Sequence, residues 1–208
     1  NMLSPEENRR LRDFRVAVVG CGGRGEHIIE MLARLGIEHI TAIDADVFEA
    51  SNLNRQLLSR PSNLGQPKAF EAKKHITEIN PEVKVHAVYT RLSLQNALSL
   101  LEGHDMICDA LDNVSSRRIL QDAAEELNIP MVYAAIAGWY AQVCTIMPGD
   151  RTLDKIYFDQ TTEKGAETQL GNPSFTPALA ASIQVAECLK VLLDKSGILR
   201  QRMLIIDL

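Results

Sequence analysis

The sequence predicts a Rossmann-like α/β fold: a doubly wound, mainly parallel sheet flanked by helices, with an antiparallel extension towards its C-terminus. Two observations carry this prediction. Short apolar runs rich in β-branched residues, typical of buried parallel strands, alternate with segments whose apolar residues recur at helical spacing. A glycine-rich turn at residues 20–25 joins the first apolar run to the first helical segment, as in a βαβ unit.

The first βαβ unit begins with a strand predicted at residues 15–19. The helical segment after the glycine-rich turn ends at Gly36, and residues 39–43 predict a second strand that Asp44 closes. The same alternation then predicts helices at 66–79, 94–102 and 115–127 and strands at 83–88, 106–110 and 130–135.

Beyond residue 135 the alternation changes. Residues 142–147 predict a strand that extends the sheet in the antiparallel direction, and the polar residues 149–173, with several glycines, predict a long loop. Residues 203–208 predict a closing strand. The segment 176–193 predicts an amphipathic helix with the apolar stripe Leu179, Ile183, Ala186, Leu189, Leu192 and Leu193.

We therefore predict one domain over residues 1–208. It consists of a core at 1–147, a crossover loop at 148–175, and a C-terminal helix and strand at 176–208.

The composition excludes several classes of protein. With 46% hydrophobic and 24% charged residues, the chain can bury a core without disulfides or metal ions. A formal net charge of −5 gives no reason to expect nucleic acid or an anionic membrane as a partner. No apolar run approaches the roughly 20 residues of a membrane span, and the N-terminus lacks the apolar segment of a signal peptide.

The cysteines are Cys21, Cys108, Cys144 and Cys188, and none of them forms a CxxC pair. This spacing indicates neither a zinc ribbon nor a thioredoxin-type pair. Three of them lie in apolar runs and Cys188 lies in a predicted helix, so we expect buried free thiols. Free thiols fit a reducing compartment, and we expect a cytoplasmic protein.

The glycine-rich turn predicts an anion-binding site. Gly20, Gly22, Gly23 and Gly25 let the backbone approach a phosphate, and the following helix N-terminus offers unpaired N–H groups. Asp44 ends the second strand, where a carboxylate can accept hydrogen bonds from ribose hydroxyls. An adenine nucleotide is indicated. By themselves these features suit NAD and ATP equally, and a turn whose glycines serve packing alone is a third interpretation.

Further polar residues favour ATP. They are Asp46, the segment Ser51-Asn52-Leu53-Asn54-Arg55-Gln56, Lys68 at a helix start, and Asp112, Asn113 and Arg117 after a strand. A nucleotidyl-transfer enzyme needs cations for a triphosphate and a carboxylate for Mg²⁺, whereas an NAD dehydrogenase does not need this set. Arg55 and Lys68 supply the cations, and Asp112 supplies the carboxylate. Because a doubly wound sheet binds ligands at its strand carboxyl ends, these groups can converge.

The motifs GxGGxG, DxD, SNLNRQ, GxxK and DN, in this order, resemble those of the ThiF/MoeB/HesA adenylyltransferases, relatives of the adenylation domains of ubiquitin-activating enzymes. The resemblance covers residues 15–147 and the helix at 176–193. It implies an ATP-dependent enzyme that adenylates the C-terminal glycine carboxylate of a ubiquitin-like sulfur-carrier protein, of the ThiS or MoaD kind, and releases pyrophosphate. It also implies an obligate homodimer, with thiamin or molybdopterin synthesis or a related sulfur pathway as the expected pathway.

The resemblance also assigns roles to residues. Gly23 falls at a nucleotide-contact position of the glycine loop, and Asp44 matches the acid that holds the ribose. Lys68 matches the lysine that reaches the phosphates, and Asp112 matches the aspartate needed for Mg²⁺ and catalysis. The segment that grips the phosphates is matched by Ser51, Asn52, Asn54 and Arg55, with Gln56 beside them.

Several of these residues also have a purely structural interpretation. Lys68 can be a surface lysine, although a helix N-terminus disfavours a cation. Asp112 and Asn113 can cap the following helix. Asp46 and Arg117 are equally well explained by ion pairs that hold the surrounding loops.

The chain departs from the family in four ways. It lacks the paired CxxC motifs of many members, so we expect no zinc, and its crossover loop has no cysteine, so we expect no covalent intermediate with the carrier. In place of the usual N-terminal arginine it offers residues 8–10, or Arg24, where the family has an apolar residue. Arg24 either adds charge to the phosphate site or is an exposed residue at a helix start. Relatives often continue with a further strand beyond Leu208, so we expect a truncated sequence.

Other functions remain possible at this point. An adenylyltransferase of the same fold can act on a tRNA base or a peptide C-terminus, although the acidic balance disfavours tRNA. A non-catalytic partner subunit would have no reason to keep Arg55, Lys68 and Asp112. An NAD oxidoreductase would need a second domain to hold its substrate.

Overall fold

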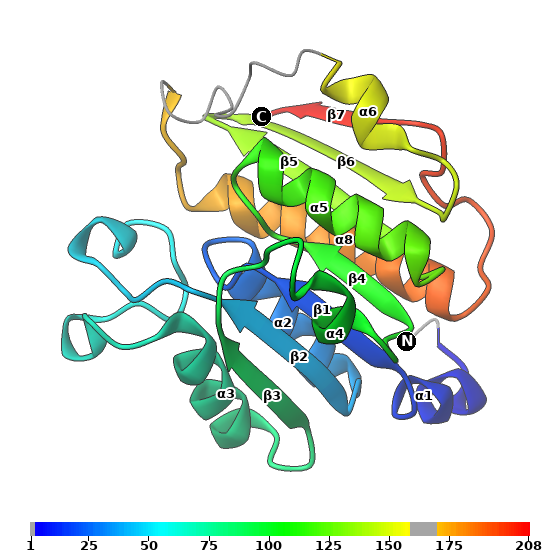
Figure 1. The fold of residues 1–208 in the computed structure, drawn as a ribbon. Helices are drawn as coiled ribbons and strands as arrows, with labels where there is room; N and C mark the ends of the chain where they lie inside the picture. Colours follow the sequence, from blue (N-terminus) through cyan, green and yellow to red (C-terminus); the bar gives the residue numbers. More distant parts are fainter. Residues whose placement is uncertain (1–2, 159–169) are drawn as a thin grey trace.

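The computed structural model describes residues 3–158 and 170–208. Its sheet has the strand order β3-β2-β1-β4-β5-β6-β7 (Figure 1). The strands are β1 (Arg15–Val19), β2 (His39–Asp44), β3 (Lys84–Tyr89), β4 (Met106–Asp109), β5 (Met131–Ala137), β6 (Tyr140–Ile146) and β7 (Leu204–Asp207). The helices are α1 (Pro5–Leu11), α2 (Gly25–Leu35), α3 (Lys68–Ile79), α4 (Ala97–Leu101), α5 (Val114–Glu126), α6 (Thr152–Ile156) and α8 (Phe175–Leu192), with the 3₁₀ turns η1 (Ala50–Asn52) and η2 (Pro61–Asn63).

The topology confirms the predicted fold class. Strands β1 to β5 pair in parallel, whereas β6 and β7 join the sheet in the antiparallel direction. The chain builds β1, β2 and β3 outward in one direction and then returns to place β4 on the other side of β1. In a doubly wound sheet, such a reversal opens a crevice at the carboxyl ends of the strands.

Strand β1 shows how the sheet separates two cores. Val16 and Val18 belong to the core under α2, α3 and α8, while Ala17 and Val19 belong to the core under α4, α5 and α6. Alternate residues of a strand face opposite sides, so a run that is buried on both faces is apolar throughout. Figure 1 shows the same arrangement, with α4 and α5 in front of the sheet and α2 and α8 behind it.

The structure confirms only part of the apolar stripe predicted for α8: Leu192 and the following Leu193 are buried, and Ile183 and Leu189 are partly buried against the core. Ala180, Gln184 and Cys188 are buried, whereas Ala186, which we assigned to the apolar stripe, is exposed, and Leu179 is only partly buried. Small residues let α8 pack closely on the sheet. Because the helix is apolar on most sides, periodicity alone could not identify its inward face.

The helix α8 is also long and apolar enough to cross a membrane by length and composition, with a mean hydropathy of 1.3 over 18 residues. Half of it is buried within the fold, as expected of a core helix.

Two short helices were not predicted. Ser4 caps α1 through a reciprocal hydrogen-bonded pair with Glu7, and α6 lies within the predicted crossover loop. Residues 159–169 of that loop lie outside the described residues.

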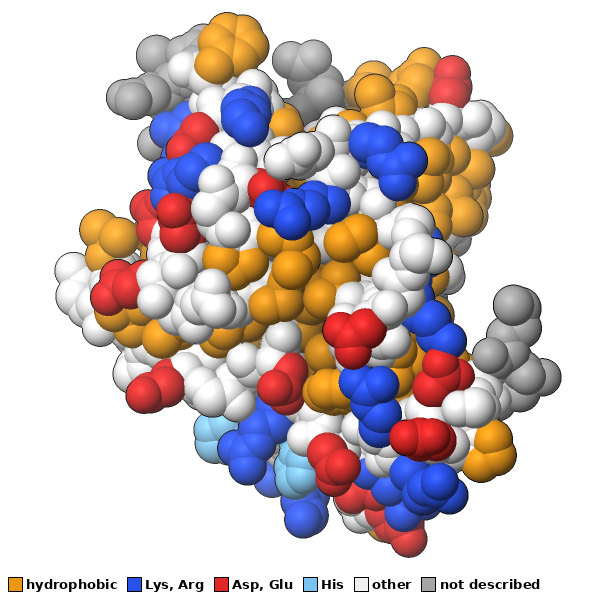
Figure 2. Space-filling view, turned by 90° about the vertical axis from the view of Figure 1, so that its right-hand side faces the viewer, with side chains coloured by type: hydrophobic (Ala, Val, Ile, Leu, Met, Phe, Trp, Pro, Cys, Tyr) orange, Lys and Arg blue, Asp and Glu red, His pale blue; other side chains and the backbone are white. Residues whose placement is uncertain are grey.

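Charge on the surface is mixed rather than segregated. On the face in Figure 2, Lys and Arg side chains lie among Asp and Glu side chains, with hydrophobic side chains between them. The visible described residues of this face form no continuous basic stripe.

Candidate functional site

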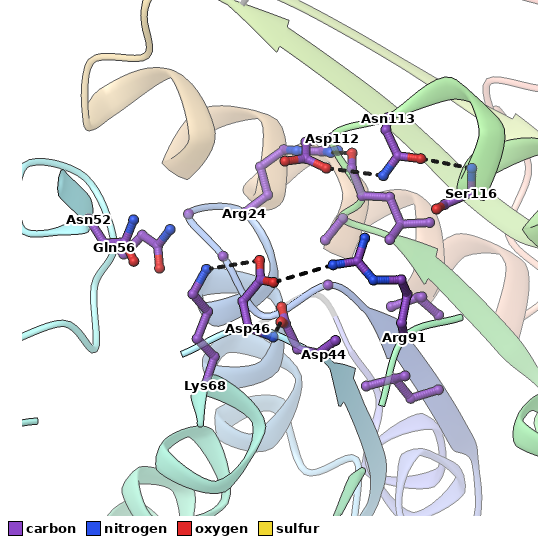
Figure 3. A pocket seen from close by; sticks show the side chains of 18 of the residues that line it. Arg24, Asp44, Asp46, Asn52, Gln56, Lys68, Arg91, Asp112, Asn113 and Ser116 are labelled. Atoms are coloured by element: carbon purple, nitrogen blue, oxygen red, sulfur yellow. Dashed lines mark hydrogen bonds and ion pairs between the residues drawn. The ribbon is translucent and has the colours of Figure 1, made fainter. Parts of the chain in front are cut away.

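A polar cavity of about 780 Å³ lies over the carboxyl ends of β1, β2, β3 and β4 (Figure 3). Thirteen of the fifteen predicted site residues line it; these are Gly20, Gly22, Gly23, Asp44, Asp46, Ser51, Asn52, Arg55, Gln56, Lys68, Asp112, Asn113 and Arg117. The two others, Gly25 and Asn54, lie outside its wall. Groups far apart in sequence thus meet at one edge of the sheet because parallel strands share their carboxyl edge.

The four glycines of the loop after β1 serve two different purposes. A Cβ on Gly20 would lie 2.6 Å from the Ala110 carbonyl oxygen, and one on Gly25 would lie 1.8 Å from the Gly20 carbonyl oxygen. Gly25 is therefore needed for packing, and it does not line the cavity. At Gly22 and Gly23 an added Cβ would meet nothing closer than 3.4 Å. These two glycines leave the backbone open to the cavity, as an approaching phosphate requires.

Asp44 ends β2 and organises the turns on both sides of it. One carboxylate oxygen accepts a hydrogen bond from the Cys21 N–H (2.5 Å), and the other accepts one from the Asp46 N–H (2.7 Å). Burial raises the pKa of this carboxyl group. Each oxygen keeps a further lone pair, so Asp44 can still accept hydrogen bonds from a ribose.

The segment around η1 carries Arg55 into the cavity wall. The Arg55 guanidinium donates hydrogen bonds to the Ser51 carbonyl oxygen (3.0 Å) and to the Asn54 side-chain oxygen (2.9 Å). Asn54 therefore orients Arg55 and does not itself line the cavity. The neighbouring Gln56 is buried, and its side-chain oxygen has no hydrogen-bond partner among the described residues.

Lys68 begins α3, and its side chain is only 8% exposed. Its ammonium nitrogen lies 3.6 Å from the Asp46 carboxylate, while the Arg91 guanidinium lies 4.0 Å from the other oxygen of that carboxylate (Figure 3). The surface-lysine interpretation of Lys68 is therefore wrong, and Asp46 does make the expected ion pair. We did not predict Arg91, although it follows β3 as the other site residues follow their strands.

Asp112 and Asn113, directly before α5, have different roles. The Asn113 side chain accepts a hydrogen bond from the Ser116 N–H (2.8 Å) and so caps the helix. Asp112 is exposed, and its carboxylate accepts a hydrogen bond from the Asn113 amide at 3.3 Å. The carboxylate of Asp112 is thus available to a ligand in the cavity (Figure 3).

This donor set fits Mg²⁺. The described residues contain no cluster of three or more His, Cys, Asp or Glu side chains that would enclose a metal ion. Mg²⁺ in proteins is commonly held by one or two carboxylates together with substrate phosphates. Asp112 would supply the protein's share of such a site.

Two arginines at the cavity are buried. Arg117 forms an ion pair with Asp109 (3.2 Å), as one interpretation of its sequence predicted, and donates a hydrogen bond to the Tyr157 hydroxyl (2.9 Å). Arg24 is 5% exposed and donates to three backbone carbonyl oxygens. The interpretation of Arg24 as an exposed helix-start residue is therefore wrong. Arg10, in the N-terminal segment 8–10, forms an ion pair with Asp194, which follows the C-terminal end of α8. Arg10 therefore does not line the cavity of its own chain.

Glu26 is a buried acid that we did not predict. It lies in the first turn of α2, and one oxygen accepts a hydrogen bond from the Leu58 N–H (2.9 Å). The other oxygen has no partner among the described residues. Burial raises the pKa of Glu26 from 4.5 to about 8. The acid therefore tethers the segment that carries Arg55 while mostly protonated at neutral pH.

We predict that Glu26 makes stability depend on pH. Between pH 4.5 and about 8 the folded protein retains a proton that the unfolded chain releases. Its contribution to the free energy of unfolding therefore falls as pH rises, by about 1.4 kcal/mol per pH unit at most. In Glu26→Gln, urea denaturation at pH 5, 6, 7 and 8 should show a flatter profile than wild type. Equal slopes in the two proteins would contradict this role.

The fold and the cavity define an α/β protein of the Rossmann-like, doubly wound class. The chain belongs to the ThiF family, whose model matches residues 1–208.

Similar proteins support the family assignment. The chain is 34% identical to the SAMP-activating enzyme E1 of Haloferax volcanii, over 99% of this chain and 77% of that protein. It is also 34% identical to the sulfur carrier protein adenylyltransferase of Thermus thermophilus, over 99% of this chain and 79% of that protein. Among solved structures, E. coli MccB with AMPCPP and MccA matches with a TM-score of 0.82 and 22% identity, over 97% of this chain and 63% of that one. At that identity the structural match shows the fold alone.

Proposed function

We propose that this protein is an ATP-dependent adenylyltransferase that activates the C-terminal carboxylate of a ubiquitin-like sulfur-carrier protein. The observation that carries the proposal is the convergence of Arg55, Lys68 and Asp112 on one cavity beside an open glycine loop. Cations and a metal-binding carboxylate around a phosphate-binding loop are what nucleotidyl transfer requires. The relatives at 34% identity are named for this chemistry.

In the proposed reaction, a carboxylate oxygen of the carrier attacks the α-phosphorus of ATP. A new P–O bond forms, the bond to the bridging oxygen breaks, and its electron pair leaves with pyrophosphate. The carboxylate is already ionised near pH 7, so no general base is needed. Gly22 and Gly23 receive the phosphates, Asp44 holds the ribose, and Arg55 and Lys68 neutralise charge on the departing phosphates. When bound at Asp112, Mg²⁺ would supply further charge neutralisation.

The proposal includes a homodimer in a reducing cytoplasm. The side of α8 that is not fully buried carries Leu179, Ile183 and Ala186. On this side the Ser182 hydroxyl contacts the Met31 sulfur on α2. An apolar helix face of this kind suits a second protein surface. The four cysteines are buried free thiols, which suits a reducing compartment.

ATP–pyrophosphate exchange tests the proposed activity. We expect exchange to depend on a carrier of the ubiquitin-like type ending in Gly-Gly, because its carboxylate is the attacking group. The matched control is the same carrier without its last glycine, which should fail since its carboxylate ends short of the α-phosphorus. Binding of nicotinamide dinucleotide without binding of ATP, measured by calorimetry, would contradict the proposal.

A further inference from the structure

The strands β4 and β5 diverge just where the cavity begins. They pair over only two positions, Ile107 with Met131 and Cys108 with Val132. Beyond them, the carbonyl oxygens of Asp109 and Ala134 accept hydrogen bonds from side chains. Because a buried carbonyl without a partner costs free energy, the divergence requires donors from elsewhere in the fold.

Arg24 donates three hydrogen bonds to backbone carbonyl oxygens in this region. One terminal nitrogen of its guanidinium donates to the Asp109 oxygen (3.1 Å) and to the Ala134 oxygen (2.6 Å), and the other donates to the Leu111 oxygen (2.6 Å). Arg24 itself lies in the glycine loop, directly before α2. One side chain thus connects the phosphate-facing loop after β1 with the end of β4, with β5 and with the turn that precedes Asp112.

A second arginine shares the same acceptors. Arg117 donates to the Leu111 oxygen (2.5 Å) and to the Ala134 oxygen (3.1 Å), so each oxygen receives hydrogen bonds from two guanidinium groups. The Gln184 amide on α8 adds a hydrogen bond to the Asp109 oxygen (2.8 Å). Side chains from three separate helical segments therefore fill the gap between the two strands.

An arginine at this depth is costly, which argues that its contacts matter. Arg24 is 5% exposed, and burial lowers the pKa of its guanidinium group. The nearby carboxylate of Asp109 is already paired with Arg117 at 3.2 Å. A buried charge persists only where hydrogen bonds and nearby charges compensate its lost hydration. The three carbonyl oxygens provide that compensation for Arg24.

We propose that Arg24 is a positioning residue that fixes the turn before Asp112 relative to the glycine loop. This inference rests on the proposed function, in which both parts must contact the same triphosphate. Backbone hydrogen bonds hold only the ends of the two parts next to the strands, from Gly20 to Ile43 (2.8 Å) and from Ala110 to Val19 (2.9 Å), whereas Leu111 and Asp112 lie outside any helix or strand. Nucleotidyl transfer depends on orientation and on prearranged charge, so relative movement of the two parts would lower the rate.

The planar fork of arginine suits this task better than other side chains. A methionine of similar length would leave three carbonyl oxygens without the donor that Arg24 supplies. A lysine would keep the charge, but it donates from one nitrogen and cannot reproduce bonds from two nitrogens of a rigid fork. The variants Arg24→Met and Arg24→Lys therefore separate the loss of the fork from the loss of the charge.

The test combines two measurements on wild type, Arg24→Met and Arg24→Lys. The first is amide hydrogen exchange of residues 109–113 in the protein without nucleotide or metal, which we expect to accelerate about tenfold in Arg24→Met. The second is the Mg²⁺ dependence of ATP–pyrophosphate exchange. We expect about a 10²-fold lower kcat and a higher Mg²⁺ requirement for Arg24→Met, and intermediate values for Arg24→Lys.

The matched control is Arg34→Met, on the helix α2 that follows Arg24. Arg34 is exposed and pairs with Glu30 at 2.8 Å, away from the cavity, so this variant should behave as wild type. A folded Arg24→Met with wild-type exchange at 109–113 and wild-type Mg²⁺ dependence would overturn the inference. A lower melting temperature with unchanged Mg²⁺ dependence would also overturn it, because that result indicates packing alone.

Two further outcomes are also informative. If Arg24→Met does not fold, Arg24→Lys takes its place. Wild-type amide hydrogen exchange at residues 109–113 in that variant then overturns the inference. If wild type shows no ATP–pyrophosphate exchange with any carrier, the proposed function fails. The hydrogen-exchange measurement then still decides whether Arg24 holds the turn, since it uses neither ATP nor carrier.

Discussion

Replacing Asp112 with asparagine is expected to lower the rate of ATP–pyrophosphate exchange by about 10³-fold. The change keeps the size of the side chain but removes its charge, and with it the proposed ligand for Mg²⁺. Stability should change little, because Asp112 is exposed and the capping hydrogen bond belongs to Asn113. Exchange assays at saturating ATP, together with thermal denaturation, measure the two effects separately.

The matched control for this variant is Asp122→Asn on α5. Asp122 is also an exposed aspartate, but it pairs with Arg151 and does not line the cavity. We expect wild-type exchange from this control. Survival of near-wild-type exchange in Asp112→Asn would show that another group performs the role assigned to Asp112, and the proposed metal site would have to be abandoned.

The second largest effect is expected from Lys68→Met, with about a 10²-fold fall in kcat/KM for ATP. The Lys68 side chain is almost fully buried in the cavity wall, where its ammonium group is held beside the Asp46 carboxylate. Removing the ammonium takes away a cation for the phosphates and leaves Asp46 with Arg91 as its remaining partner, 4.0 Å away. The Asp46 carboxylate, compensated by this more distant cation alone, would then repel the triphosphate.

Two controls make this prediction specific. Lys74→Met alters an exposed lysine of the same helix α3, and its exchange rate should match wild type. In the double variant Lys68→Met/Asp46→Asn, part of the ATP affinity should return, since the repelling charge is gone. If Lys68→Met binds ATP as tightly as wild type and exchanges pyrophosphate at the same rate, Lys68 only stabilises the Asp46 turn.

Much of the fold could be predicted because its pattern is local. The alternation of apolar runs and helical segments gave the parallel strands, and the glycine turn marked the crevice. Boundaries were less accurate for the third predicted helix, at 94–102, where α4 covers only Ala97–Leu101. The inward face of α8 was assigned only in part, because a helix that is apolar on most sides carries little directional signal.

The predicted site followed a simple rule, and its exceptions have physical causes. Polar residues at or just after the ends of parallel strands meet at one edge, which brought Asp44 and Asp112 to the same cavity as Lys68 at the start of α3. Arg91 obeys the same rule and was overlooked. Gly25 and Asn54 matched a motif, yet the structure places one in backbone packing and the other behind Arg55.

By itself, the sequence determined the order of strands and helices and the residues that gather at their carboxyl ends, because periodicity and chain direction are properties of neighbouring residues. Only the tertiary structure decided the positions of Arg24, Arg117 and Glu26. Each of these charged side chains is buried. The partners that make burial tolerable, such as the carbonyls of Asp109 and Ala134, become available only when β4 and β5 diverge. Burial of a charge is settled by groups distant in sequence, which no local pattern records.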